Sequence, residues 1–166
     1  MLTQQVQSGD IDLILTVSPK PVEKLKTVKV YADDFAFFIS PNYKKIKRKT
    51  VTLQDLAEHP ILTDNHAHLA QDRSVLRAMS SLGLYSSSFF QLNSFEASIR
   101  LADKALGIAL LPIKIAQNLR PRFEMLKLTV KDIPKDHFRH HVCATYLESS
   151  SLAENMCQFI RKQLTK

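Results

Sequence analysis

Glycine is scarce in this sequence. Gly9, Gly83 and Gly107 are the three glycines among 166 residues, whereas average usage of about 7% predicts near a dozen. Neither Gly-x-Gly-x-x-Gly nor a P-loop is present, and both motifs use glycine to bring backbone N–H groups close to phosphates. We therefore do not expect the chain to hold a nucleotide by its pyrophosphate, and we expect no cofactor.

The sequence also has few cysteines and no long apolar run. Cys143 and Cys157 are the two cysteines, and without a Cys-x-x-Cys spacing they are expected to be buried, reduced thiols. A redox or nucleophilic role is the alternative, but no base motif accompanies either thiol.

No run of about 18 apolar residues exists to span a membrane, and Met1–Asp10 lacks the layout of a signal peptide. These absences predict a cytoplasmic protein with no membrane partner.

Positive charge is concentrated in one segment. The formal net charge is +7, and residues 44–49 (Lys-Lys-Ile-Lys-Arg-Lys) carry +5, which leaves +2 for the rest of the chain. A basic run between two strand-like segments is usually a solvated loop, and a phosphate-binding patch is the alternative. A local charge of this kind does not indicate a nucleic-acid-binding protein.

Strand-like and helix-like segments alternate along the chain, which predicts an α/β fold with a mostly parallel sheet. Strands are expected at Ile11–Val17, Val28–Tyr31, Phe35–Ser40, Pro60–Thr63, Ser88–Leu92, Gly107–Leu111, Phe123–Leu128 and His141–Leu147. Helices are expected at Leu2–Ser8, after the capping box Thr52–Asp55, at Leu69–Leu82, after Asn93 or Ser94, after Pro112, and from Ser151 onward.

Three of these elements carry further predictions. The run Ile11–Val17 should be a strand buried on both faces, behind a helix that Gly9 ends in the left-handed conformation. A turn at Asp33-Asp34 should separate two strands. The last helix should be capped by Ser151 and should pack through the apolar face formed by Leu152, Met156, Phe159, Ile160 and Leu164.

Ligands of such sheets bind where strands end at their carboxyl side. Short hydroxyl, amide and imidazole side chains at two of these ends could bind a carboxylate or another anion, although ordinary loop capping explains them as well. Ser94 would cap its helix in either case, and the free N–H groups of that helix could also hold an anion. The candidate ligand-binding residues are Thr16, Ser18, Thr63, Asn65, His66, Ser94 and Phe95.

Four segments resemble, in order and spacing, the effector-binding domain of the LysR-type transcriptional regulators. They are Val6–Leu15 (VQSGDIDLIL), Leu53–Leu56 followed by Pro60–Leu62, Asn93–Ala97 (NSFEA), and Leu101–Pro112 (LADKALGIALLP). Each segment alone is a weak signal, but together they cover nearly the whole chain.

The resemblance implies a two-lobed periplasmic-binding-protein-like fold of type II, with two crossing strands between the lobes and a small effector held between them. Lobe I would hold residues 1–31 and 139–166, and lobe II residues 32–138. The family's helix-turn-helix and the first strand–helix–strand of lobe I are absent, so we expect an incomplete first lobe, an open edge beside Ile11–Val17, and no specific DNA binding by this chain. Ala105 stands where many members have glycine, so its turn either avoids the left-handed region or is strained.

Two other functions compete with an effector sensor. Asp64–His68 (DNHAH) imitates a metal site and leaves a small metal-dependent hydrolase as the alternative, although no acidic partner motif recurs and no metal ligand set is complete. The segment Leu69–Leu84 superficially imitates a DNA-recognition helix, but no first helix precedes it. The sequence therefore predicts a sensor domain with no catalytic residues, which acts in a homo-oligomer and reaches DNA only through a helix-turn-helix outside this chain.

Overall fold

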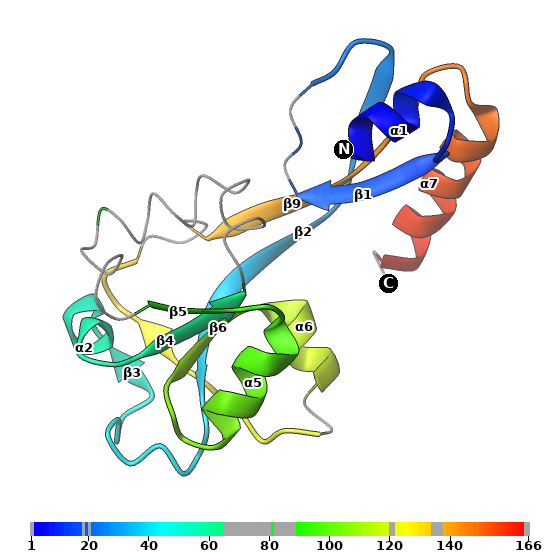
Figure 1. Ribbon diagram of the computed structural model, residues 1–166. Coiled ribbons are helices and arrows are strands. Elements are labelled where there is room, and N and C mark those ends of the chain that lie inside the picture. The colour runs from blue at the N-terminus through cyan, green and yellow to red at the C-terminus, as the bar shows by residue number, and fades with distance from the viewer. Residues whose placement is uncertain are drawn as a thin grey trace. The chain divides into compact units, whose positions relative to one another are not determined.

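The computed structural model describes residues 2–17, 19, 21–64, 81, 89–119, 122–133 and 138–164, and the chain forms two compact units (Figure 1). Unit 1 comprises Met1–Asp33 and His140–Lys166, and unit 2 comprises Asp34–Arg139. The chain passes between them within strand β2 (Leu25–Ile39) and at the start of strand β9 (Arg139–Leu147). No helix in the described ranges is long and apolar enough to cross a membrane.

Unit 1 is a small sheet with a helix on each face. Its strands lie in the order β1-β9-β2, and its other elements are α1 (Leu2–Ser8), β1 (Leu13–Val17) and α7 (Ser151–Leu164). Neighbouring residues of a strand point to opposite faces of its sheet. On the face that α1 covers, Ile14 of β1 packs with Val6 of α1. On the other face, Ala153 and Cys157 of α7 pack on a cluster that includes Val30, Ala144 and Tyr146. Gly9 ends α1 with φ +81°, as the sequence predicted.

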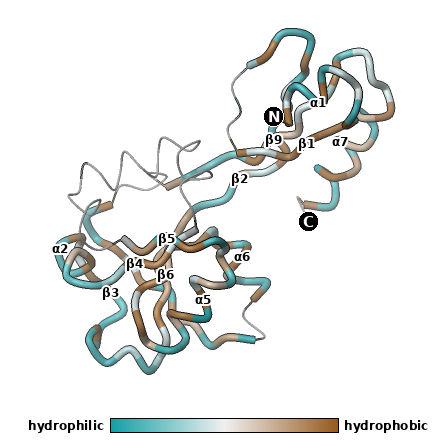
Figure 2. The backbone as a smooth tube through the Cα atoms, in the orientation of Figure 1, coloured by the Kyte–Doolittle hydropathy of each residue, from teal (hydrophilic) through white to brown (hydrophobic). Residues whose placement is uncertain are grey.

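Unit 2 contains the larger sheet, with strands in the order β2-β6-β4-β5 and β7 paired to β2. Its other elements are β3 (Thr50–Val51), α2 (Leu53–Ala57), β4 (Ile61–Asp64), β5 (Phe89–Leu92), α5 (Phe95–Asp103), β6 (Ile108–Pro112), α6 (Ile113–Leu119), β7 (Leu126–Lys127) and β8 (Thr129–Val130). The apolar strands β4 and β6 appear brown in Figure 2, and all five residues of β6 are buried.

Helices cover both faces of the unit 2 sheet because its strands are apolar on both sides. Phe37, Ile61 and Leu110 pack with Leu53 and Leu56 of α2 on one face. On the other face, the alternate strand residues pack with α5 and α6; this cluster includes Ala36, Phe38, Leu62, Ala109, Leu111, Ile99, Ala102 and Ala116. Packing helices on both faces of a strand removes nearly all of its apolar surface from water. This burial of apolar surface is the main contribution that stabilises a fold.

The predicted capping box of α2 is present. The Thr52 hydroxyl accepts a hydrogen bond from the Asp55 N–H at 3.2 Å, and the Asp55 carboxylate accepts one from the Thr52 N–H at 2.7 Å. The hydrogen bonds from Thr52 lower the pKa of Asp55 below its ordinary value. This local signal was readable from the sequence because both partners lie within one turn.

Several expectations about strands were wrong. The sheet is not mostly parallel: β4 pairs in parallel with β5 and β6, but β1 with β9 and β2 with β6 are antiparallel. Asp33-Asp34 is not a turn, because β2 continues through both residues as it leaves unit 1. The strand β1 is not buried on both faces, since Leu15 is 48% exposed.

The prediction for the last helix was wrong in its buried face. Ala153 and Cys157 are buried, whereas Leu152, Met156 and Phe159 are exposed. Of the predicted face, Ile160 does pack against the cluster under the helix. The cap is also one residue earlier than predicted, because the Ser150 hydroxyl accepts from the Ala153 N–H at 3.2 Å. The apolar stripe was real, but periodicity does not say what covers it.

Ala105 adopts the strained, left-handed conformation, one of the two possibilities that the sequence allowed. Its φ is +56°, a region that costs an L-residue with a side chain roughly 1–2 kcal/mol. The turn is held by hydrogen bonds from the Ala105 N–H to Ala102 O at 2.8 Å and from the Leu106 N–H to Leu101 O at 3.1 Å. These bonds satisfy the carbonyls at the end of α5 and offset the strain.

Candidate functional site: the carboxyl edge of the unit 2 sheet

Three parallel strands of unit 2 end at one edge of the sheet. Asp64 of β4 lies opposite Leu92 of β5, and β6, parallel to β4, ends at Pro112. Phe35 of β2 lies opposite Pro112, so the antiparallel β2 enters unit 2 at this same edge. The fold therefore brings the end of β4 and the start of α5 together here, as expected for ligand sites of such sheets.

Ser94 caps α5 at this edge. Its backbone is extended (φ −164°, ψ 154°), and its hydroxyl oxygen accepts from the Ala97 N–H at 3.1 Å. The hydroxyl proton stays available for an acceptor outside the helix, and the N–H groups of the first turn point the same way. This combination favours an anion, because helix N-termini carry partial positive charge.

The acidic residue of this first turn does not repel an anion strongly. Glu96 is joined to Arg100 at 2.8 Å, a pair one helical turn apart on the surface of α5. The guanidinium offsets the carboxylate charge, although an exposed pair of this kind contributes little to stability. Ser98, which is wholly buried, ties the cap further by donating from its hydroxyl to Ser94 O at 3.3 Å.

Phe95 and Phe35 form an apolar wall beside the cap. Their ring centroids lie 6.1 Å apart with planes tilted by 56°, a favourable aromatic geometry. Phe95 is half-buried, and Phe35 is buried in the main cluster of unit 2. Phe95 was predicted from the sequence. Phe35, which only strand pairing brings to this edge, and Ser98, one helical turn after Ser94, were not predicted.

Thr63 lies at the same edge but is inside the sheet. The side chain is fully buried, and its hydroxyl donates to Leu110 O on the neighbouring strand at 3.4 Å. The oxygen can still accept a hydrogen bond. The contribution of Thr63 to ligand binding stays a prediction.

Thr16 of unit 1 differs from Thr63 in its hydrogen bonding. It lies near the carboxyl end of β1, opposite Cys143 of β9. Its hydroxyl oxygen is buried, and within the described residues it has no hydrogen-bond partner. A buried hydroxyl without a hydrogen bond lowers the stability of the fold, and the described residues supply no hydrogen bond that would offset this cost at Thr16.

The remaining predicted ligand residues, Ser18, Asn65 and His66, lie outside the described residues. The hydrolase alternative rests on Asp64–His68, of which the structure describes only the backbone of Asp64. Within the described part of the chain, no group of three His, Cys, Asp or Glu side chains is placed to hold a metal ion.

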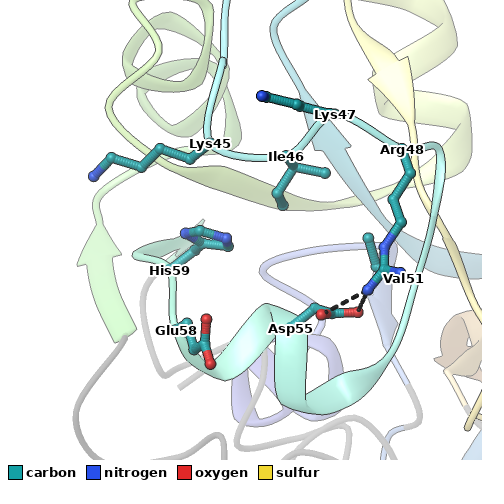
Figure 3. A pocket seen from close by; sticks show the side chains of 8 residues that line it. All are labelled: Lys45, Ile46, Lys47, Arg48, Val51, Asp55, Glu58 and His59. Atoms are coloured by element: carbon teal, nitrogen blue, oxygen red, sulfur yellow. Dashed lines mark hydrogen bonds and ion pairs between the residues drawn. The ribbon is translucent and has the colours of Figure 1, made fainter.

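The basic run lines a hollow of unit 2 that has a volume of about 370 Å³ (Figure 3). Lys45, Lys47 and Arg48 stand on one side, and Arg48 donates to both carboxylate oxygens of Asp55, at 2.9 and 2.8 Å. His59, on the other side, precedes β4 by two residues, so this hollow lies at the amino end of β4, opposite the Ser94 edge. The assignment of the run as a solvated loop, with a phosphate-binding patch as its alternative, stays a prediction.

The comparisons with known proteins agree on one family. The family model of the LysR substrate binding domain matches residues 1–165. The chain is 22% identical over 111 residues to YybE of Bacillus subtilis (strain 168), an uncharacterized HTH-type transcriptional regulator. That match covers 67% of this chain and 38% of the regulator, so the chain spans well under half of its relative.

Solved structures share the fold at low sequence identity. A mutant regulatory domain of OxyR2 from Vibrio vulnificus, with sulfate bound, has a TM-score of 0.72 at 17% identity, over 98% of this chain and 76% of that one. The effector binding domain of QuiR in complex with shikimate has a TM-score of 0.72 at 11% identity, with the same two coverages. The described fold is thus the two-lobed type II fold of these regulatory domains.

The family also bears on the alternative function, a small metal-dependent hydrolase. Domains of this family are regulatory, effector-binding and non-enzymatic. The chain belongs to the LysR substrate-binding domain family.

Proposed function

We propose that this chain is the effector-sensing domain of a LysR-type transcriptional regulator, and that it binds a small anion at the Ser94 edge without chemical turnover. The observation that carries the proposal is the Ser94 cap: a hydroxyl with a free proton and the N–H groups of a nine-residue helix meet at the carboxyl ends of parallel strands. The cap supplies hydrogen-bond donors, which suits a carboxylate or an oxyanion. Sulfate and shikimate, which are bound to two structurally similar domains, are both anions.

Each predicted residue has a distinct part in the proposal. Ser94 donates to the anion, Phe95 supplies an apolar wall against Phe35, and Thr63 accepts from a ligand hydroxyl. Thr16 contributes the hydroxyl of unit 1 that has no partner in the described part of the chain. Ser18, Asn65 and His66 belong to the same proposal through their positions after β1 and β4 in the sequence.

The proposal extends to the partners of the whole regulator. YybE is named as an HTH-type regulator, and we propose that DNA is bound by a helix-turn-helix outside residues 1–166, in a cytoplasmic homo-oligomer. The effector would then act by favouring one arrangement of that assembly over another.

The test is a titration of the purified chain with sulfate and with shikimate by calorimetry. We expect saturable binding of at least one of them. Ser94→Ala should weaken it by about 10- to 150-fold, because a hydrogen bond to a charged group contributes about 1.5–3 kcal/mol. Thr16→Val should weaken it in the same range.

Ser150→Ala is a matched control, because Ser150 caps α7 of unit 1 through the same type of bond, to the Ala153 N–H at 3.2 Å. It should lose about 1 kcal/mol of stability, as Ser94→Ala does through its own cap, but no affinity. Equal affinity in wild type and in both binding variants would place the ligand elsewhere.

A further inference from the structure

The basic run, residues 44–49, is attached to unit 2 at three points. Tyr43, which immediately precedes the run, is buried in the main core cluster of unit 2, and Ile46, within the run, packs against the same cluster. At the end of the run, the Lys49 carbonyl accepts a hydrogen bond from the Thr129 N–H at 2.8 Å. A segment that is already ordered loses little conformational entropy when it binds a ligand, so the run is well prepared for binding.

Arg48 is oriented by a carboxylate that is itself fixed. The carboxylate of Asp55 accepts hydrogen bonds from the Thr52 N–H at 2.7 Å and from the Thr52 hydroxyl at 2.8 Å, at the start of α2. A single nitrogen of Arg48, Nη2, donates to both oxygens of this carboxylate. The N–H groups on Nε and Nη1 of Arg48 have no partner within the described residues. An arginine held in this way presents a planar set of donors that suits a phosphate.

Two lysines line the same hollow as this arginine. Lys45 and Lys47 form no ion pair and no side-chain hydrogen bond in the part of the chain that the structure describes. Because Arg48 and Asp55 balance each other, the two lysines give the hollow an excess of positive charge over Glu58, its other acidic residue. The volume of about 370 Å³ lies within the roughly 300–1,000 Å³ that is typical of small-molecule sites.

The side of the hollow that faces the basic run suits a different part of a ligand. His59 and Glu58 stand on that side, across the hollow from Ile46 (Figure 3). The ring of Tyr43 packs edge-on against His59, with ring centroids 5.6 Å apart and planes at 83°, which limits the rotation of the imidazole. The Glu58 carboxylate accepts hydrogen bonds and repels a second negative charge. A ligand that fills the hollow therefore carries its anion at one end and hydroxyl groups at the other.

We propose that this hollow is a second ligand site, which binds a small organic phosphate with hydroxyl groups, of the class of sugar phosphates and nucleoside monophosphates. Arg48, Lys45 and Lys47 hold the phosphate, whose charge of about −1.5 to −2 matches the two unpaired lysines. Glu58 accepts from a hydroxyl of the sugar. The hollow lies at the amino end of β4, whereas the Ser94 edge lies at the carboxyl end. The second site therefore goes beyond the proposed function and does not depend on it.

Titrations of the whole 166-residue chain, followed by amide NMR at physiological salt, test the site. The probes are ribose phosphorylated on its primary hydroxyl and AMP, which extends the same sugar phosphate by a base. We expect at least one of them to shift the amides of residues 45–48, Glu58 and His59 in a saturable way. Ribose and adenosine, which lack the phosphate, should cause no shift. Inorganic phosphate should bind more weakly than the organic phosphate, because it lacks the hydroxyl groups that reach Glu58.

Variants with matched controls assign the binding to the hollow. Arg48→Gln and Lys47→Gln should each weaken it about tenfold or more, because each removes a charge-assisted hydrogen bond. Arg122→Gln and Lys104→Gln remove the same charge from exposed residues of unit 2 outside the hollow, and they should bind like the wild type. The amide spectra should show all four variants folded, since an exposed ion pair contributes little to stability. Equal weakening in all four variants would indicate a general effect of net charge and overturn the proposal.

The same titrations separate this site from the Ser94 edge. Shifts confined to the amides of residues 95–97 would assign the phosphate to the Ser94 edge and overturn the second site, while leaving the proposed function intact. Failure of sulfate and shikimate to bind would count against the proposed function alone. No saturable shift with either organic phosphate would overturn the second site and leave the run a solvated loop. Shifts of residues 45–48 by a mixed-sequence DNA duplex, with none by the small phosphates, would overturn it as well.

Discussion

The two units use similar apolar strands in different ways. In unit 2, all five residues of β6 are buried between helices on both faces. In unit 1, β1 has an equally apolar sequence, LILTV, yet Ile14 is its one buried residue. The difference teaches that an apolar strand contributes to stability only as far as its neighbours cover it.

The first and largest test of this comparison uses one leucine from each strand. Leu110→Ala removes a fully buried side chain of β6 and should cost about 2–5 kcal/mol of unfolding free energy. Leu15→Ala, at a side chain that is 48% exposed, should cost much less. Urea unfolding followed by circular dichroism measures both, and hydrogen exchange assigns the loss to a unit. Equal costs would show that β1 is as well covered as β6.

A second test compares two glycines. An added Cβ at Gly107 would lie 2.6 Å from Pro60 O, the carbonyl that accepts from the Ile108 N–H at 2.8 Å. Gly107→Ala must therefore move the start of β6 or of β4, at a cost of about 1–3 kcal/mol. Gly9→Ala meets no atom within 4 Å and is opposed only by its φ of +81°. Thermal unfolding should show the larger loss in Gly107→Ala; the reverse order would mean that unit 2 is the more adaptable unit.

Alkaline pH should separate the units as well. Burial raises the pKa values of Cys157 and Tyr146 above the ordinary 9.0 and 10.0, and the hydrogen bond to Glu154 raises that of Lys26 above 10.5. Each group therefore contributes stability that is complete below its ordinary pKa and is lost as the pH rises through its folded-state value. In unit 2, burial raises the pKa of Tyr43 in the same way.

We thus expect amides of unit 1 to lose more exchange protection than those of unit 2 between pH 8 and pH 11, after correction for the intrinsic exchange rate. In acid the sign is reversed for Asp55 of unit 2, whose pKa is lowered by its bonds from Thr52, so its contribution is lost as the pH falls below 3.8. A uniform loss of protection in alkali would contradict the prediction.

The smallest expected effect concerns two threonines of unit 1. Thr145 is buried and shares a hydrogen bond of 3.1 Å with Thr27, so Thr145→Val should cost about 1 kcal/mol. The Thr16 hydroxyl has no partner within the described residues, so Thr16→Val should leave the unfolding free energy unchanged or slightly higher. A loss in Thr16→Val as large as in Thr145→Val would reveal a partner in another part of the chain.

Much of the candidate site could be predicted because its signals are local. The cap at Ser94 lies within one helical turn, and Thr63 and Thr16 were placed near strand ends by apolar runs that stop there. Phe35 was missed because nothing near it in the sequence refers to β6. Ser98 follows the Ser94 cap by one helical turn, so its signal was local, but it was not singled out. The lobe limits and the ligand residues stay predictions.

By itself, the sequence determined the features that depend on neighbours within a few residues, together with the family: the left-handed end of α1 at Gly9, the capping box of Thr52 and Asp55, the Ser94 cap, and the four segments shared with LysR-type domains. Only the tertiary structure decided the direction of strand pairing, the passage of β2 through Asp33 and Asp34, and the outward face of Leu152 and Phe159. The physical reason is that a pattern of apolar residues sets which side chains avoid water, whereas the partner that covers them comes from distant segments and is chosen by packing.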